Sequence, residues 1–287
     1  MVRAYRALLV MTILCSLGLG SVAAGQEVPW DKLPNVPADL SAEAKSRAVE
    51  LMKSEMCYYG CEGSVLDCAT RSAPHKTALF AAGFITRQVA RGKPNKEVSK
   101  DFLDRASSVH PFKTVDLDLT TAVCLGATNA RVVVVAFTDL ECPFCRMVSP
   151  VLRKLAADRP KEVTYCYKFF PVKGHGQLAV KTSKLGVAAD VLGKFWEFHD
   201  VMYQQFEKHD DSDIAGYAKS LGLDWARMQE IAGAKETKKR VTTSKREGLK
   251  LGVKSTPTIY VNGKLYHGEK SEVELVDRVE EELMLAQ

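Results

Sequence analysis

The stretch RVVVVAFTDLECPFC, residues 131–145, decides the fold. Its β-branched run up to Phe137 is typical of a strand that is buried on both faces of a sheet. Residues 144–157 have the apolar spacing of a helix. The pair Cys142 and Cys145 therefore lies where a buried strand passes into a helix.

This position favours thiolate chemistry at the first cysteine. Free backbone N–H groups and the dipole at a helix N-terminus lower a cysteine pKa from its usual value of ~8.5. Pro143 suits the first helical turn, where its missing N–H costs nothing. We therefore expect Cys142 to be the exposed nucleophile and Cys145 the shielded resolving thiol, with disulfides exchanged through a mixed disulfide. A structural disulfide and half of a zinc site are the alternatives, but no second C-x-x-C completes the zinc site.

The segments around this pair predict a mixed α/β sheet. Further strands are expected at residues 114–119, 163–170, 258–261 and 265–267. The pattern from His175 to about Leu251 is helical, and a final helix is expected at 271–284. This order gives a parallel βαβ unit followed by an antiparallel hairpin and a closing helix.

A small helical unit is expected before the sheet, at residues 41–110, with the remaining domain at 111–287. Its expected helices are about 41–54, 75–91 and 96–107. Residues 26–40 are rich in proline and short polar residues, which is typical of a linker.

The first 25 residues have the pattern of a signal peptide. Arg3 and Arg6 precede a short apolar stretch, and small residues follow it near Ala24. We therefore expect an exported protein, periplasmic or extracellular, in a compartment where disulfides persist. Removal of Cys15 leaves seven cysteines, so at least one is outside a disulfide pair.

Composition excludes few functions. Of the 287 residues 46% are apolar, and the formal net charge is +5. These values are ordinary for a globular protein. No basic stripe with interleaved aromatic residues is present, so we expect no nucleic-acid partner.

Two segments together resemble a known family. Phe137-Thr-Asp-Leu-Glu-Cys-Pro-Phe-Cys145 and Ser255-Thr-Pro-Thr-Ile-Tyr-Val-Asn-Gly263 are similar to the DsbA-like branch of the thioredoxin superfamily, and the likeness covers about residues 112–285. The resemblance implies an α/β, thioredoxin-like fold with a helical insertion at about 174–252, preceded here by the small helical N-terminal unit.

The resemblance also implies roles at the site. Pro257 would be cis and face the cysteine pair, and Thr256 would help bind the substrate backbone beside Pro143 and Phe144. No cofactor is required, because the electrons reside in the cysteine pair. The implied partners are protein thiols and disulfides, together with a redox-recycling partner for which a membrane-bound protein is the candidate.

Other residues are candidates for tuning the pair. Lys168 either lies under the active site or is a solvated strand residue, and Glu141 would raise the thiol pKa if it is close. Ala136 occupies the position where some family members carry a buried acid. His175 falls where the family often has a histidine, and we expect a helix-start or surface role for it.

The remaining cysteines leave alternatives open. The unit around Cys57, Cys61 and Cys68 resembles cysteine-rich helical units found ahead of some DsbA-like domains and in cytochrome c maturation proteins. It holds either one disulfide, such as Cys61–Cys68, with a spare thiol, or a metal site. The metal ligands would be Cys57, Cys61, Cys68 and His75. Cys124 and Cys166 either pair with each other or are buried, inert thiols.

The predicted function is therefore thiol–disulfide exchange with secreted or periplasmic proteins through Cys142 and Cys145, with the direction left open. The alternatives are a metal-binding protein or metallochaperone that uses the N-terminal cysteines, and a dedicated reductant in cytochrome c maturation.

Overall fold

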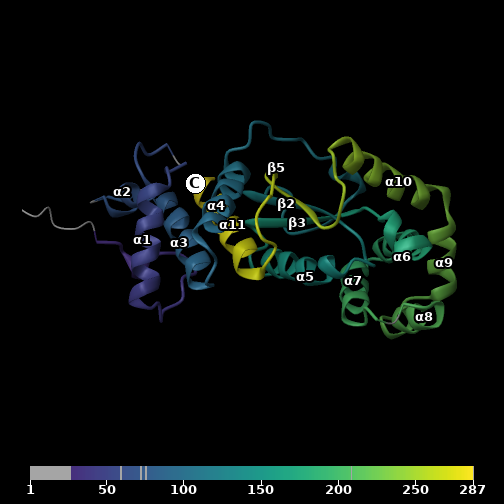
Figure 1. Cartoon of the computed structure of the whole chain (residues 1–287). Coiled ribbons are helices and arrows are strands. Elements are labelled where there is room, and N and C mark those ends of the chain that lie inside the picture. Colours follow the sequence, from purple (N-terminus) through teal and green to yellow (C-terminus); the bar gives the residue numbers. More distant parts are fainter. Residues whose placement is uncertain (1–26, 59, 72, 75, 208, 287) are drawn as a thin grey trace, which may run out of the picture.

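The computed structural model describes residues 27–286 except 59, 72, 75 and 208. The predicted signal peptide, 1–25, lies outside these residues. A sheet occupies the middle of the molecule, with the N-terminal helices at one end and a second group of helices at the other (Figure 1). Within the described ranges, no helix has the length and apolar character needed to cross a bilayer.

The described part of the chain forms one five-stranded sheet, in the order β1-β3-β2-β4-β5. The strands are β1 Val123–Leu125, β2 Val132–Thr138, β3 Val163–Phe169, β4 Thr258–Val261 and β5 Lys264–Leu265. β3 runs parallel to β2, and the other neighbouring pairs are antiparallel. The predicted mixed α/β sheet with a closing hairpin is confirmed.

Helices account for most of the remaining described residues. The N-terminal helices are α1 Ala42–Ser54, α2 Val65–Thr70, α3 Lys76–Ala90 and α4 Asn95–Val109. The later helices are α5 Pro143–Asp158, α6 Gly176–Val191, α7 Phe195–Gln204, α8 Asp211–Ser220, α9 Trp225–Gly233, α10 Lys235–Lys250 and α11 Glu272–Leu285. Short 3₁₀ turns lie at Trp30–Lys32, Leu119–Thr121 and Lys173–His175. The helical N-terminal unit is confirmed, and α6–α10 follow β3 where the helical insertion was expected.

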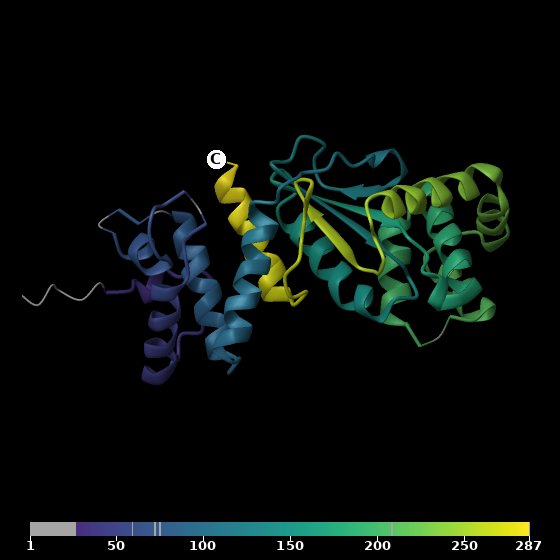
Figure 2. The same cartoon turned by 45° about the horizontal axis from the view of Figure 1, so that its top comes forward.

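The two faces of the sheet carry different cores, because successive side chains of a strand point to opposite faces. On β3, Tyr165 and Tyr167 join the core that also contains Cys142 and Cys145. Cys166 points to the other face, into a smaller cluster. Figure 2 shows the sheet lying between helices of the two groups.

A glycine sets the approach of α10 to this smaller cluster. A Cβ added to Gly248 would lie 2.7 Å from the Phe170 ring and 3.0 Å from the Phe137 ring. Any larger residue would therefore push α10 away from the sheet.

The prediction of a strand at residues 114–119 is wrong. Residues 114–118 hold no strand, and Leu119 begins a 3₁₀ turn. The Val115 N–H donates to the Gly263 carbonyl at 2.9 Å, and the Asp118 carbonyl accepts from the Lys168 amine. Val115 and Leu117 pack on the smaller cluster, which explains their alternation without strand pairing. β1, which was not predicted, forms the edge of the sheet instead. The expected strand at 265–267 ends early, because the His267 N–H donates to Ser108 Oγ at 2.8 Å.

The expected linker at residues 26–40 also needs correction, since its described part packs on the N-terminal helices. Val28 and Leu33 are buried in the same core as α1 and α3. The Asn35 side-chain amide donates to Asp277 Oδ1 at 3.0 Å. A few apolar and amide side chains among the prolines are enough to hold this segment in place.

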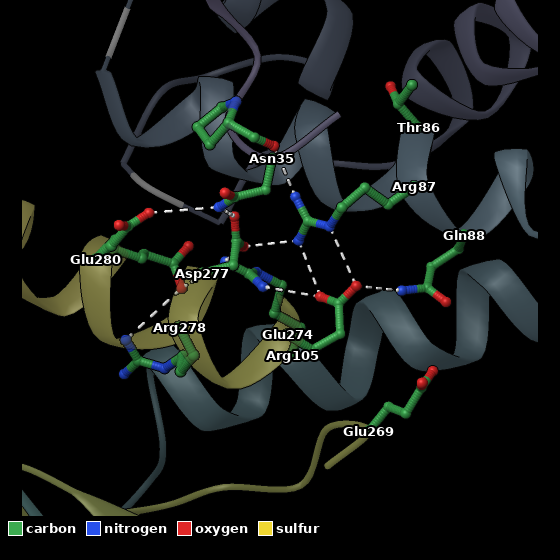
Figure 3. A network of polar contacts seen from close by, with 12 residues as sticks. Asn35, Thr86, Arg87, Gln88, Arg105, Glu269, Glu274, Asp277, Arg278 and Glu280 are labelled. Atoms are coloured by element: carbon green, nitrogen blue, oxygen red, sulfur yellow. Dashed lines mark hydrogen bonds and ion pairs between the residues drawn. The ribbon is translucent and has the colours of Figure 1, made fainter. Parts of the chain in front are cut away.

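Buried ion pairs join the N-terminal helices to α11 (Figure 3). Arg87 of α3 contacts Glu274 at 2.9 Å and Asp277 at 2.7 Å. Arg105 of α4 contacts Asp277 at 2.8 Å and Glu281 at 2.9 Å. All five residues are at most 2% exposed, so these contacts are made away from water.

Charge at this interface is nearly balanced. Within the described residues, the buried part of the cluster contains three guanidinium groups and four carboxyl groups: Arg87, Arg105, Arg278, Glu274, Asp277, Glu281 and Glu282. The partly exposed Arg91 and Lys264 add two cations, which contact Glu274 and Glu282. Burial and the neighbouring Glu282 raise the pKa of Glu281 well above its usual value. This shift favours the protonated form of Glu281.

Replacing Arg87 by methionine tests whether this network holds α3 to α11. The substitution removes the cation that contacts both Glu274 and Asp277 and leaves these buried carboxyl groups with fewer partners, so we expect a loss of about 3 kcal/mol in the free energy of unfolding. Urea denaturation followed by circular dichroism measures it. Lys100→Met is the control, because the Lys100–Asp104 pair is exposed and worth about 1 kcal/mol or less. Equal losses in the two variants would contradict this role for Arg87.

Candidate active site

The first turn of α5 positions the cysteine pair. Cys142 is the N-cap residue, and its Sγ accepts a hydrogen bond from the Cys145 N–H at 3.4 Å. Pro143 fills the first helical position, as its fixed φ allows. The Cys142 N–H donates to the Asp139 carbonyl at 3.1 Å, which closes the turn between β2 and α5. A thiolate at Cys142 would thus face the free N–H groups of a helix.

A second loop reaches the same place through the sheet. β4 pairs antiparallel with β2, with Thr258 opposite Phe137. The residues just before Thr258 therefore lie beside the end of β2. The Thr256–Pro257 peptide bond is cis, as the resemblance implies. The Cys142 thiol donates to the Thr256 carbonyl at 3.3 Å, so both loops meet at one sulfur.

The two thiols differ in acidity. Hydrogen bonding from the Cys145 side chain, supported by Thr256 and by the N–H groups of Cys145 and Phe144, lowers the pKa of Cys142 to about 6, against the effect of burial. Burial raises the pKa of Cys145 well above its usual value. At neutral pH the pair therefore favours a thiolate at Cys142 and a thiol at Cys145.

Cys142 is not exposed as expected: only 2% of its surface is accessible. The Thr256 loop and the first turn of α5 cover it. Beside it, Phe144 is 62% exposed and Met147 61% exposed, which gives an apolar surface next to the sulfur. A substrate that reaches the sulfur must first displace the contact with Thr256.

Lys168 has neither of its expected positions. It is fully buried on β3, and its side chain points to the sheet face opposite the cysteine pair. There its amine donates to Glu247 and to the Asp118 carbonyl. A buried ion pair therefore explains this lysine better than tuning of Cys142.

Glu141 is turned toward a histidine. Its carboxylate lies 2.9 Å from His209 Nδ1, and His209 Nε2 lies 2.8 Å from the Met202 carbonyl. Burial lowers the pKa of His209, but hydrogen bonding and the charge of Glu141 outweigh it and raise the pKa overall. A positive His209 then offsets the charge of Glu141 beside Cys142.

Asp139 was missed by the sequence interpretation, although it lies three residues before Cys142. Its buried carboxylate accepts hydrogen bonds from the Glu141 N–H at 3.0 Å and the Val172 N–H at 2.8 Å. His175 Nδ1 lies 2.8 Å from the same carboxylate. His175 is the N-cap residue of α6, so the expected helix-start position is found, and the contact ties the insertion to the cysteine loop.

A buried network below α5 has the layout of a hydrolase triad. Ser149 Oγ lies 2.7 Å from His199 Nε2, and His199 Nδ1 lies 2.9 Å from Asp200 Oδ1. Ser149 and His199 are both fully buried, so no substrate can reach this serine. Its hydroxyl also lies 2.6 Å from Tyr165, which makes the network part of the core.

Four of the other described cysteines form two disulfides. Cys124 and Cys166 are joined across β1 and β3, where they are register partners. Cys61 and Cys68 are joined in the N-terminal unit, and Cys57 remains a free thiol. The expected metal ligands are therefore not available as three thiolates in this structure, and His75 lies outside the described residues.

Comparison with known proteins identifies the family. The thioredoxin family profile matches residues 118–281. The chain belongs to the thioredoxin family. Among solved structures, this thioredoxin-family chain is similar to a thioredoxin-like oxidoreductase from Silicibacter pomeroyi, with 26% identity, a TM-score of 0.52 and coverage of 58% of this chain and 96% of that one. BdbD from Bacillus subtilis has 22% identity and a TM-score of 0.52, over 60% of this chain and 97% of that one.

A DsbA-like protein is also among the neighbours. The thiol-disulfide exchange protein alpha-DsbA2 from Wolbachia pipientis has 22% identity and a TM-score of 0.51, over 64% of this chain and 97% of that one. These neighbours confirm the thioredoxin-like, DsbA-like fold. Among curated relatives, a Na(+)/H(+) antiporter NhaA 3 from Salinispora tropica is 31% identical over 143 residues, half of this chain. The chain spans only 22% of the length of that antiporter.

The acidity of Cys142 can be measured directly. We expect alkylation of the reduced protein by iodoacetamide to rise with a midpoint near the pKa of about 6. Cys145→Ala should move the midpoint upward, because it removes the hydrogen bond that lowers this pKa most. Cys57 is an internal control, since burial raises its pKa to about 11 and it should react little below pH 8. A midpoint close to the ~8.5 of a free cysteine would contradict the geometry.

Proposed function

We propose that the chain is an exported thiol–disulfide oxidoreductase in which Cys142 forms the mixed disulfide with a substrate protein and Cys145 resolves it. One observation carries this proposal. The Cys142 sulfur is held between the N-terminal N–H groups of α5 and the Thr256 carbonyl, with its pKa lowered to about 6.

The exchange begins from the oxidised pair. A substrate thiolate attacks Cys142 Sγ, and the Cys142–Cys145 bond breaks with its electron pair passing to Cys145, which takes a proton. A second substrate thiolate then attacks the substrate sulfur of the mixed disulfide and releases the Cys142 thiolate. Two electrons pass from the substrate to the pair, and the substrate gains one disulfide.

The lowered pKa of Cys142 supports disulfide donation as the favoured direction. A stabilised thiolate is a good leaving group. It also lowers the free energy of the reduced pair and so raises the reduction potential. The raised pKa of Cys145 fits a sulfur that takes up a proton when the pair is reduced, and in the reverse direction this thiol resolves the mixed disulfide.

Substrate proteins would bind in extended form. The Thr256–Pro257 loop offers backbone groups beside the sulfur, and the exposed Phe144 and Met147 offer apolar contact. Backbone hydrogen bonds of this kind are independent of sequence, so we expect a broad range of client proteins.

Location and recycling complete the proposal. The signal-peptide pattern at 1–25 supports export, and disulfides at Cys61–Cys68 and Cys124–Cys166 suit an oxidising compartment. We assign catalysis to residues 111–287. Each donated disulfide leaves the pair reduced, so a redox partner must reoxidise it, and a membrane-bound protein is the candidate.

Two substitutions test the roles of the cysteines. Cys142→Ser should lower the rate of disulfide exchange with a reduced, unfolded protein by about 10³-fold or more, as removal of a nucleophile does in other enzymes. Cys145→Ser, reduced and then mixed with a disulfide-containing substrate protein, should instead accumulate a mixed disulfide at Cys142, visible by mass spectrometry. Lys100→Met, which changes an exposed ion pair outside the site, is the control and should leave the rate unchanged. Full activity of Cys142→Ser would overturn the proposed function.

The reduction potential of the pair tests the direction. Glutathione buffers, thiol alkylation and mass spectrometry should place it above the value of about −270 mV known for thioredoxin and below about −120 mV. A value at or below that of thioredoxin would reverse the direction to reduction. No reversible titration of Cys142 and Cys145 would argue against exchange altogether.

A further inference from the structure

Three sulfur atoms converge in the N-terminal unit. The Sγ atoms of Cys57, Cys61 and Cys68 all lie within 4.8 Å of one another. Cys61 and Cys68 form a disulfide, and Cys57 is a free thiol. A disulfide with a third sulfur at this distance contains the three atoms that thiol–disulfide exchange requires.

The backbone holds this arrangement in place. The Cys57 N–H donates to the Gly63 carbonyl at 3.0 Å, and the Val65 N–H donates to the Glu55 carbonyl at 2.8 Å. These bonds close the loop that carries Cys61. α2 begins directly after it and carries the buried Cys68, so the free thiol stays beside the disulfide.

This cluster is separate from the candidate active site. α2 lies at one end of the molecule, and α7 and α8 lie at the other (Figure 1). Glu141, next to Cys142, contacts His209 in the connection between α7 and α8. The two sets of cysteines therefore face different surroundings and can serve different partners.

The burial of the three residues suits stepwise exchange. Cys57 is partly exposed, and exposed Gly60 and Glu62 lie in the loop beside Cys61, whereas Cys68 is fully buried. A partner can therefore approach the disulfide from the side of Cys61. Cys57 therefore needs only a small movement, if any, to reach the separation of about 3.5 Å from which reaction occurs.

We propose that Cys57, Cys61 and Cys68 form a second thiol–disulfide exchange site, in which a cysteine thiol of a partner opens the disulfide at Cys61 and Cys57 then releases the partner. This site goes beyond the proposed function, because it uses none of the residues of the Cys142 centre. The partner is a peptide or protein thiol, which triggers the exchange and is regenerated by it.

The steps balance without an added oxidant or reductant. The partner thiolate attacks Cys61 Sγ, the Cys61–Cys68 bond breaks, and the Cys68 sulfur receives the electron pair and a proton. Cys57 then loses its proton and attacks Cys61 Sγ, so that the partner leaves with the electron pair. The disulfide has moved from Cys61–Cys68 to Cys57–Cys61, and the partner is unchanged.

Burial also explains why the disulfide is stable before a partner arrives. It raises the pKa of Cys57 to about 11, although the charge of Arg71 opposes the shift. Cys57 is therefore protonated at neutral pH and does not attack the neighbouring disulfide unaided.

The test uses the full mature chain carrying Cys142→Ser and Cys145→Ser, so that the candidate active site cannot exchange disulfides. Reduced glutathione is the probe, followed by acid quenching, alkylation and disulfide mapping by mass spectrometry. We expect a Cys57–Cys61 disulfide to appear. With Cys57→Ser added, that product should be absent, because only the freed Cys68 remains to attack Cys61, and it restores the Cys61–Cys68 disulfide.

Two controls keep the result interpretable. The Cys124–Cys166 disulfide, whose Cys166 is fully buried, should stay intact in the same samples. Thermal melts should show that the Cys57→Ser chain still folds, and Cys57→Ala provides a second variant if it does not.

Two results would overturn the proposal. Persistence of Cys61–Cys68 as the sole pairing in this unit, with no adduct at Cys61, would make the disulfide purely structural. Stoichiometric zinc in freshly purified protein, lost with Cys57→Ser, would make the cluster a metal site. Either result leaves the proposed function of Cys142 intact, because these chains lack that centre.

Discussion

The antiparallel pairing of β2 with β4 is the constraint on which the candidate site depends. It sets Thr258 opposite Phe137, and so brings together two loops that are 114 residues apart at the Cys142–Thr256 contact. Without this register, Cys142 would be an ordinary N-cap cysteine with helix N–H groups on one side only. With it, the Cys142 sulfur also lies beside the Thr256 carbonyl. This carbonyl accepts a hydrogen bond from the thiol, and a bound peptide would replace that bond. The lowered pKa of Cys142 follows first from its hydrogen bond with the Cys145 side chain, and the raised pKa of Cys145 follows from burial.

α11 connects the core around the candidate site to the N-terminal helices. Leu275 and Val279 pack into the main core, which also contains the cysteine pair. The charged side chains of the same helix meet Arg87 and Arg105 from the N-terminal helices. One helix thus belongs to two environments, an apolar one toward the sheet and an ionic one toward α3 and α4. The ionic contacts restrict orientation, because each guanidinium needs its carboxylates at hydrogen-bonding distance.

Sequence patterns predicted the features that depend on local chemistry. The strand before Cys142, the helix after it and β4 at Thr258–Val261 lie where their side chains indicated, since buried strands and helix starts leave strong local signals. Features set by distant contacts were not predictable. The alternation at residues 114–119 reflects packing rather than strand pairing, and the burial of Cys142 depends on a loop far along the chain. The sequence around Lys168 does not indicate its ion-pair partner Glu247, which lies 79 residues later.

The short edges of the sheet have a consequence for a protein that would handle unfolded chains. β1 is three residues long and β5 two, and a disulfide from Cys124 fastens β1 to its neighbour. Long unpaired edges invite other chains to add as further strands, which leads to aggregation. Here an extended chain finds little free edge with which to pair. Strand addition, by which an unfolded chain would be trapped on a sheet edge, is thereby disfavoured.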